Sequence, residues 1–170
     1  MRTAVEKALE ELVDVVPAGV DGFYYQGQEL KDKKCKEVEA FKGIDTFHKL
    51  YSVLRKSWSS SIAYKSCQSE WVSEDPSYGQ CAITATLVYD MFGGSIHRIR
   101  VEGGGTHYFN KITGQYVDLT REQFDLYNIE VAYEPNETMQ REYCCKNPDT
   151  NARYRQLQRN IIAYLKNNED

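Results

Sequence analysis

The sequence predicts an α+β fold in which a buried helix carrying Cys81 packs on a small antiparallel sheet. Three observations support this. Residues 81–92 are apolar on nearly every side of a helix and end at Gly93-Gly94, a typical helix stop. Short strand-like segments separated by glycine turns follow, and helical patterns flank them on both sides. A helix followed by an antiparallel meander is typical of this class. The predicted strands lie near residues 95–101, 106–112 and 115–119.

Two helices are predicted ahead of Cys81. The first runs from about Thr3 to Val15, where apolar residues recur at helical spacing, and it ends at Pro17. The second begins with Asp45 as its N-cap and runs toward Trp58. The serine-rich segment 57–64 is expected to be a loop.

The helix carrying Cys81 has two candidate starts. Asp75 before Pro76 matches an N-cap followed by a proline at the first helical position. Ser77, with Gln80 three residues later, forms a competing capping box. Either start puts Cys81 in the first or second turn of the helix.

The turn at Thr113-Gly114 sets the register of the second and third strands. A two-residue turn there pairs Phe109 with Asp118, so that His107 and Asp118 lie diagonally on one face. Diagonal neighbours are about 7–8 Å apart at the backbone, within reach of a side-chain hydrogen bond. Asn110 then points to the opposite face. A slip of one residue would move Asp118 to the other face.

Two further helices are expected after the sheet. Thr120, with Gln123 three residues later, predicts a short helix opened by a capping box. The last helix runs from about Thr150 to Leu165 at helical spacing.

Composition excludes several classes of protein. The chain has 170 residues, 41% of them hydrophobic, which suits one folded domain. Its net charge of −4 gives no electrostatic reason to expect nucleic-acid or anionic-membrane binding. No apolar run approaches the roughly 18 residues of a membrane span, and no secretion signal is visible, so we expect a cytoplasmic protein. Five cysteines without a CxxC pair favour neither a disulfide framework nor a zinc ribbon.

Cys81, His107 and Asp118 form the candidate catalytic set. The partial positive charge at a helix N-terminus favours the thiolate of Cys81. His107 is then the candidate base, and Asp118 is the group that orients it. Backbone N–H groups of the same helical turn are candidates to hold an oxyanion. Gln80 is a further oxyanion candidate, and the candidates for contact with a substrate are Trp71 and Tyr108.

Each of these residues also has an ordinary structural interpretation. Free cysteines are commonly inert core residues, and a single strand histidine commonly has a structural role. Asp118 precedes a predicted helix start, where aspartates often cap a turn. His97 is a weaker alternative base. The joint pattern favours a site, because independent accidents would seldom give a helix-start cysteine, a strand histidine and an aspartate on the same face.

The motifs around these residues resemble the YunG-like family of bacterial proteins. They are WVSEDPSYGQCAITA from Trp71, FGG from Phe92, GTHYFN from Gly105, YVDLTREQF from Tyr116 and SWS from Ser57. The resemblance covers roughly residues 57–124. It implies a YunG-like core there. From chain length and helical periodicity we expect a single domain spanning 1–170, with helical extensions over residues 1–56 and 125–170 that lie outside the resemblance. The resemblance implies no particular reaction.

The order of the three residues is more loosely similar to the transglutaminase-like and papain-like superfamily. There a helix-start cysteine precedes a strand histidine and an aspartate on the next strand. That similarity implies cleavage or transfer at an acyl carbon through a thioester. The chain departs from it in its short spacing of 26 residues from Cys81 to His107, which argues against a deep peptide groove.

Three hypotheses follow. The first is a cysteine hydrolase or acyltransferase that needs no cofactor and acts on an amide, in a peptide, a protein or a small molecule. The second is a binding module whose ligand surface is lined by aromatic residues, namely Trp58, Trp71, Tyr78 and Tyr108. The third is a metal site formed by Cys81, His107 and Asp118, a catalytic zinc pattern in ligand number.

Overall fold

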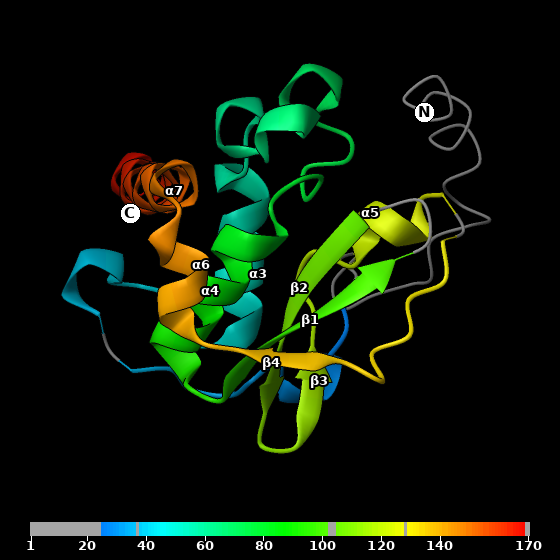
Figure 1. Ribbon diagram of the computed structural model, residues 1–170. Helices are drawn as coiled ribbons and strands as arrows, with labels where there is room; N and C mark the ends of the chain where they lie inside the picture. Colours follow the sequence, from blue (N-terminus) through cyan, green and yellow to red (C-terminus); the bar gives the residue numbers. More distant parts are fainter. Residues whose placement is uncertain (1–24, 37, 102–104, 128, 169–170) are drawn as a thin grey trace.

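The computed structural model describes residues 25–36, 38–101, 105–127 and 129–168, and its architecture is α+β as predicted. A four-stranded antiparallel sheet with strand order β3-β2-β1-β4 is flanked by helices (Figure 1). The strands are β1 (Ser95–Val101), β2 (Gly105–Ile112), β3 (Gln115–Val117) and β4 (Glu137–Met139). The helix predicted from Thr3 to Val15 lies outside the described residues.

The helices fall on both sides of the sheet. They are α3 (Phe47–Ser57), α4 (Cys81–Phe92), α5 (Glu122–Asp125), α6 (Arg141–Lys146) and α7 (Pro148–Asn167), with the short 3-10 helices η1 (Gln28–Leu30), η2 (Glu39–Phe41), η3 (Ser60–Ile62) and η4 (Lys65–Glu70). α3, α4 and α7 pack together and enclose the main apolar core, which includes Leu50, Leu54, Ile83, Leu87 and Leu157.

Neighbouring residues of β2 show which helix covers which face. Asn110 donates from Nδ2 to the Ala85 carbonyl of α4 at 2.9 Å, so its face packs on α4. The adjacent Phe109 lies in a second apolar cluster with Phe124 of α5 and with Val131. β2 is therefore covered on both faces, and its His107 side chain lies on the α5 side, where Phe124 contacts it.

Several element boundaries differ from the prediction for local reasons. α3 is capped by Thr46, whose hydroxyl accepts from Lys49 N at 3.2 Å, and not by Asp45, whose carboxylate pairs with Lys34. β3 ends at Val117, two residues early, because the backbone of Asp118 pairs with Gln26 instead. The sequence did not predict β4 or α6. α7 is longer than expected at both ends and is capped by the side chain of Asn147.

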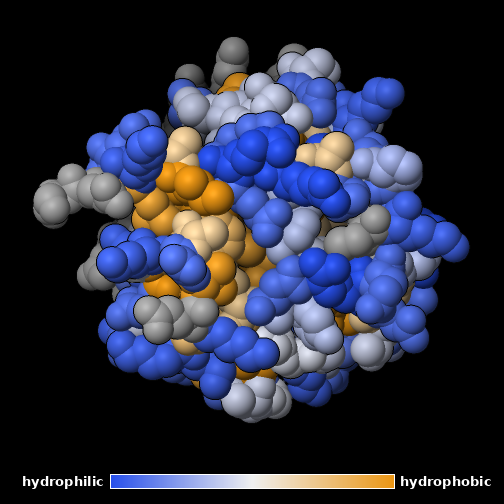
Figure 2. All heavy atoms as spheres, turned by 90° about the vertical axis from the view of Figure 1, so that its left-hand side faces the viewer, coloured by the Kyte–Doolittle hydropathy of each residue, from blue (hydrophilic) through white to orange (hydrophobic). Residues whose placement is uncertain are grey.

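The outer surface of the helical side is not uniformly polar. Figure 2 shows that an apolar area lies there among hydrophilic side chains. A groove of about 640 Å³ lies between the segment around Phe41 and α7, with Arg155 and Ile162 among its lining residues. Within the described ranges, no helix is both long enough and apolar enough to cross a membrane.

Candidate functional site

Cys81 is the first residue of α4, and the helix begins later than either predicted cap. Gly79 has a φ of +75°, a left-handed conformation that interrupts any helix starting at Asp75 or Ser77. Gln80 is the N-cap residue, and its side chain makes no capping hydrogen bond. The first turn of α4 therefore has no side-chain cap, and its N–H groups and partial positive charge lie at Cys81.

β2 and β3 pair in the predicted register. Ile112 lies opposite Gln115, and Asn110 lies opposite Val117, on either side of the Thr113-Gly114 turn. Continuing this alignment puts His107 and Asp118 diagonally on one face, just beyond the end of β3. The two-residue turn thus fixes which side chains can meet there.

His107 and Asp118 form a buried hydrogen-bonded pair. His107 Nε2 lies 2.7 Å from Asp118 Oδ2, and the residues are 1% and 2% exposed. Because a carboxylate only accepts, Nε2 carries the hydrogen and Nδ1 remains for another partner. Asp118 Oδ1 also accepts from the backbone N and the hydroxyl of Thr120, at 3.1 and 3.2 Å. These contacts fix both the carboxylate and the imidazole ring.

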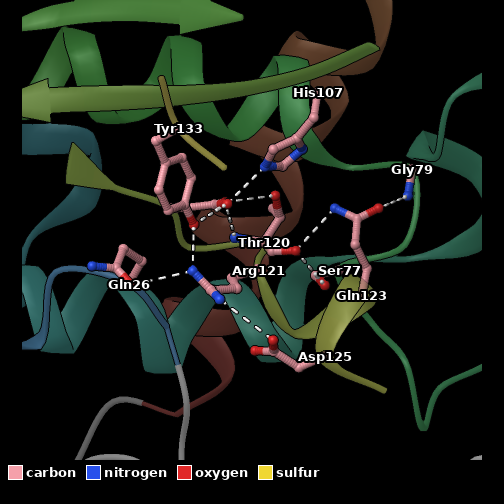
Figure 3. A network of polar contacts seen from close by, with 10 residues as sticks. Gln26, Ser77, Gly79, His107, Thr120, Arg121, Gln123, Asp125 and Tyr133 are labelled. Atoms are coloured by element: carbon pink, nitrogen blue, oxygen red, sulfur yellow. Dashed lines mark hydrogen bonds and ion pairs between the residues drawn. The ribbon is translucent and has the colours of Figure 1, made fainter. Parts of the chain in front are cut away.

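Two hydrogen bonds position the segment that leads into Cys81. The segment ahead of Cys81 packs on the chain that follows β3, where the Ser77 hydroxyl donates to the Thr120 carbonyl at 3.3 Å. The Gly79 N–H donates to Gln123 Oε1 at 3.4 Å (Figure 3). These contacts set the start of α4 beside the part of β2 that carries His107.

Cys81 and His107 shift each other's protonation. Burial raises the pKa of the Cys81 thiol, but hydrogen bonding to His107, the charge of His107 and a hydrogen bond from the Tyr108 backbone outweigh burial. The Cys81 pKa therefore lies below its ordinary 9.0. Burial lowers the pKa of His107, while Asp118 and Cys81 raise it more strongly, to about 10. Among the described residues, no group makes a hydrogen bond of ordinary geometry to His107 Nδ1, so that atom is available to the thiol.

Cys81 and His107 line a cavity of about 1130 Å³. Its walls come from η4, the start of α4, β1 and β2, α5 and the segment around α6. The short spacing between Cys81 and His107 argued against a deep peptide groove, and the cavity nevertheless has this volume. Segments outside the helix and hairpin build the walls, so the spacing does not limit the volume.

The other predicted candidates lie in three different settings. Tyr108 lines the cavity, as a substrate contact would. The Gln80 side chain is buried and donates to the Ser59 carbonyl at 2.9 Å, so it braces η3. Trp71 donates to the Pro76 carbonyl at 3.0 Å and is not among the residues that line the cavity. Trp58 is buried and bonded to Thr84, so it forms no ligand surface.

Two side chains that sequence reasoning missed complete the site. Tyr133 donates from its hydroxyl to Asp118 Oδ2 at 3.0 Å and accepts from Arg121 Nη1 at 3.1 Å (Figure 3). Gln123 holds the Gly79 N–H and lines the cavity, whereas the sequence suggested it as a capping residue. The α5 N-cap is Arg121, with no side-chain cap, so the capping box predicted at Thr120 is wrong. No periodic pattern marks Tyr133, which lies in an irregular segment.

The described part of the chain gives no support to the metal hypothesis. No group of three or more histidine, cysteine, aspartate or glutamate residues there has an arrangement that could hold a metal ion. Asp118 points an oxygen at His107 Nε2, so the two residues bond to each other and do not face a common centre.

Comparison with known proteins gives the family. The model of the YunG protein family matches residues 46–166, which extends beyond the core expected over 57–124. "Uncharacterized protein YunG" of Bacillus subtilis (strain 168) is 42% identical over 72 residues, which cover 42% of this chain and 57% of that protein. No solved structure matches. These matches lend no support to the looser similarity to transglutaminase-like proteins. Because the family model covers most of its length, the chain belongs to the YunG protein family.

Proposed function

We propose that the chain is a cysteine-dependent hydrolase or acyltransferase that acts on an amide. The observation that carries the proposal is the 2.7 Å hydrogen bond between His107 and Asp118, which leaves His107 Nδ1 for the thiol of Cys81. The cavity gives a substrate access to this thiol. A lowered thiol pKa beside a histidine with a raised pKa is the arrangement that a nucleophile and its base require.

In the first step the Cys81 thiolate attacks the amide carbonyl carbon. A carbon–sulfur bond forms, and the carbonyl electron pair moves onto the oxygen, which the N–H groups at the start of α4 stabilise. The carbonyl then re-forms and the carbon–nitrogen bond breaks. The leaving amine takes a proton from the His107 imidazolium, and a thioester remains on Cys81.

In the second step water or an amine attacks the thioester. Neutral His107 takes a proton from the attacking group, and the carbon–sulfur bond breaks to regenerate the Cys81 thiolate. Water yields a carboxylic acid, and an amine yields a new amide. Asp118 keeps its hydrogen bond to His107 throughout and favours the imidazolium form. This order of residues is analogous to that of transglutaminase-like and papain-like proteins.

Selective alkylation tests the nucleophile, and the chain offers an internal control. Cys67 lines the same cavity and is partly buried like Cys81, so the two thiols can be compared in one experiment. With iodoacetamide at pH 7, we expect Cys81 to be modified at least about tenfold faster than Cys67, because the thiolate is the reactive form and the lowered pKa of Cys81 supplies more of it. Peptide mass spectrometry over a time course measures both rates. Equal slow labelling of the two thiols would overturn the proposal.

Acyl transfer is tested with p-nitrophenyl acetate. The thiolate displaces p-nitrophenolate, and an acetyl thioester accumulates if it hydrolyses slowly. We expect a burst of nitrophenolate and an acetyl group on Cys81 in the unchanged protein and in Cys67→Ala. Cys81→Ala should show neither. Acetylation that is spread over several residues, with no loss in Cys81→Ala, would instead support a binding module with an inert thiol.

A further inference from the structure

We infer that the cavity takes its substrate as an extended polypeptide whose main chain pairs with the free edge of β2 at Thr106. This inference rests on the proposed function and narrows its substrate from amides in general to peptide segments. It comes from the geometry of the strand edge, independently of the protonation of the site.

One edge of β2 is only partly occupied. β1 pairs with β2 along its whole length, from Ser95 opposite Lys111 to Val101 opposite Gly105. On the other edge, β3 pairs only with Asn110–Ile112. In the described part of the chain, no strand pairs with residues 105–109 on that edge. A strand edge with free N–H and C=O groups is a site where another extended chain can add.

The direction of the main-chain groups follows from the hairpin. Ile112 and Gln115 flank the two-residue turn, and such a flanking pair exchanges hydrogen bonds. Ile112 therefore points its N–H and C=O toward the β3 edge. Alternate residues along a strand share that direction, so Tyr108 and Thr106 do as well. The backbone hydrogen bond from Tyr108 to the Cys81 sulfur agrees with this assignment.

The Tyr108 backbone is engaged by the Cys81 sulfur, so Thr106 is the nearest position on this edge whose main chain can pair with a peptide. It is exposed and lines the cavity together with His107 and Tyr108. Two residues of a strand span about 6.5–7 Å, so Thr106 lies that far along the edge from the Tyr108 backbone at Cys81. A peptide paired at Thr106 would present its next carbonyl to the sulfur.

The mouth of the cavity has the side chains of a peptide-binding surface. Tyr64 and Tyr143 are 56% and 52% exposed and both line the cavity. The guanidinium group of Arg153 lies over the Tyr64 ring at 5.7 Å, and that of Arg98 lies over the Tyr143 ring at 5.4 Å. Tyrosine and arginine dominate the energetics of many protein interfaces. The volume of about 1130 Å³ leaves room for a peptide of several residues.

Alkylating probes with and without a peptide chain test the inference. We compare iodoacetamide with acetyl-trialanyl chloromethyl ketone, in which the Cys81 thiolate displaces chloride and forms a thioether. Each rate is divided by the rate of the same probe with N-acetylcysteine. We expect the peptidyl probe to show at least about a tenfold advantage at Cys81, as two or more main-chain hydrogen bonds would give. No such advantage is expected at Cys67.

Methylation of single probe nitrogens shows whether the main chain is recognised. Successive amides of an extended strand point to opposite edges, so only alternate nitrogens face Thr106. We expect one methylated probe to react about fivefold more slowly and its neighbour in the series to react unchanged. Equal rates for all the methylated probes would overturn the inference.

A pair of variants tests the same contact from the protein side. Thr106→Pro removes an N–H that points away from β1 and leaves the β1 pairing intact, as proline allows at a strand edge. Thr106→Pro should reduce the rate advantage of the peptidyl probe at Cys81 and leave the iodoacetamide rate unchanged. Thr106→Ala keeps the backbone N–H, so it should keep that advantage. Iodoacetamide labelling of Cys81 confirms that each variant is folded. If iodoacetamide does not label Cys81 selectively in the protein without substitutions, the proposed function is overturned. If that labelling is selective but the peptidyl probe has no advantage at Cys81, only the inference is overturned.

Discussion

Tyr133 and His107 donate to the same oxygen of Asp118, at 3.0 and 2.7 Å. The Tyr133 hydroxyl and the imidazole ring thus compete as hydrogen-bond donors for Asp118 Oδ2. Burial and the charge of Asp118 raise the pKa of Tyr133, so its hydroxyl stays protonated and remains a donor. Arg121 holds that hydroxyl from the other side at 3.1 Å. In the proposed mechanism Tyr133 therefore acts on Cys81 only through Asp118 and His107, as a positioning residue.

Tyr133→Phe should strengthen the attraction between Asp118 and His107. With one donor removed from the shared oxygen, the imidazolium is favoured further, and the Cys81 pKa falls further below 9.0. We expect the midpoint of the alkylation rate against pH to move down by about one unit. Tyr116→Phe is the matched control, because the Tyr116 hydroxyl bonds to Glu134 and not to Asp118. An unchanged midpoint in Tyr133→Phe would mean that the tyrosine hydroxyl has no effect on the Cys81 pKa and that the side chain contributes packing alone.

Asp118→Asn should move the same midpoint in the opposite direction. Without the carboxylate charge, burial dominates at His107 and its pKa falls from about 10. The ring is then neutral near pH 7, so the Cys81 pKa rises and less thiolate is present. Alkylation at pH 7 should slow by about tenfold for each pKa unit of the rise. Asp125→Asn is the control, because Asp125 bonds to Arg121 and not to the imidazole ring. A profile that does not move would exclude a role for Asp118 in the charge of the ring.

The hairpin that carries the site could be predicted because local rules determine it. The Thr113-Gly114 turn fixes the register, and alternation then fixes the face of His107 and Asp118. The start of α4 could not be predicted in the same way. Serine is common at helix N-caps, but Ser77 is buried and its hydroxyl donates to the Thr120 carbonyl instead. A long-range contact thus overrode a local preference.

The remaining parts of the site depend on tertiary packing that leaves no pattern in the sequence. β4 has an exposed and partly charged sequence, and it forms only because Glu137–Met139 reach the free edge of β1. Tyr133 lies in an irregular segment, where no periodicity shows which side chain turns inward. The cavity combines residues from Tyr64 to Arg153 that meet only in the folded chain.

Gly94→Ala should destabilise the protein more than Gly114→Ala. Both glycines have a left-handed φ, +75° and +81°, so alanine costs about 1–2 kcal/mol of unfolding free energy at either position. A Cβ at Gly94 would also lie 2.2 Å from the Lys111 carbonyl oxygen, whereas nothing lies within 4 Å at Gly114. We expect Gly94→Ala to lose about 1–3 kcal/mol more, because the strand must shift. Urea unfolding measures both variants, and equal losses would contradict the close approach of Gly94 to β2.

Asp90→Asn should loosen α6 from α4 and α7. Asp90 accepts from Arg141 Nε and Nη2 at 2.5 and 2.8 Å, and from the hydroxyl of Tyr154. We expect a loss of about 1.5–3 kcal/mol in unfolding free energy, as for hydrogen bonds to a charged group. Asp149→Asn removes a half-exposed partner of Arg153 and should cost less than about 1 kcal/mol. Because α6 carries Tyr143, Asp90→Asn should also slow the peptidyl probe while leaving the iodoacetamide rate unchanged. If Asp90→Asn slowed the peptidyl probe and iodoacetamide equally, the substitution would have altered Cys81 itself and not the mouth of the cavity, which would contradict this prediction.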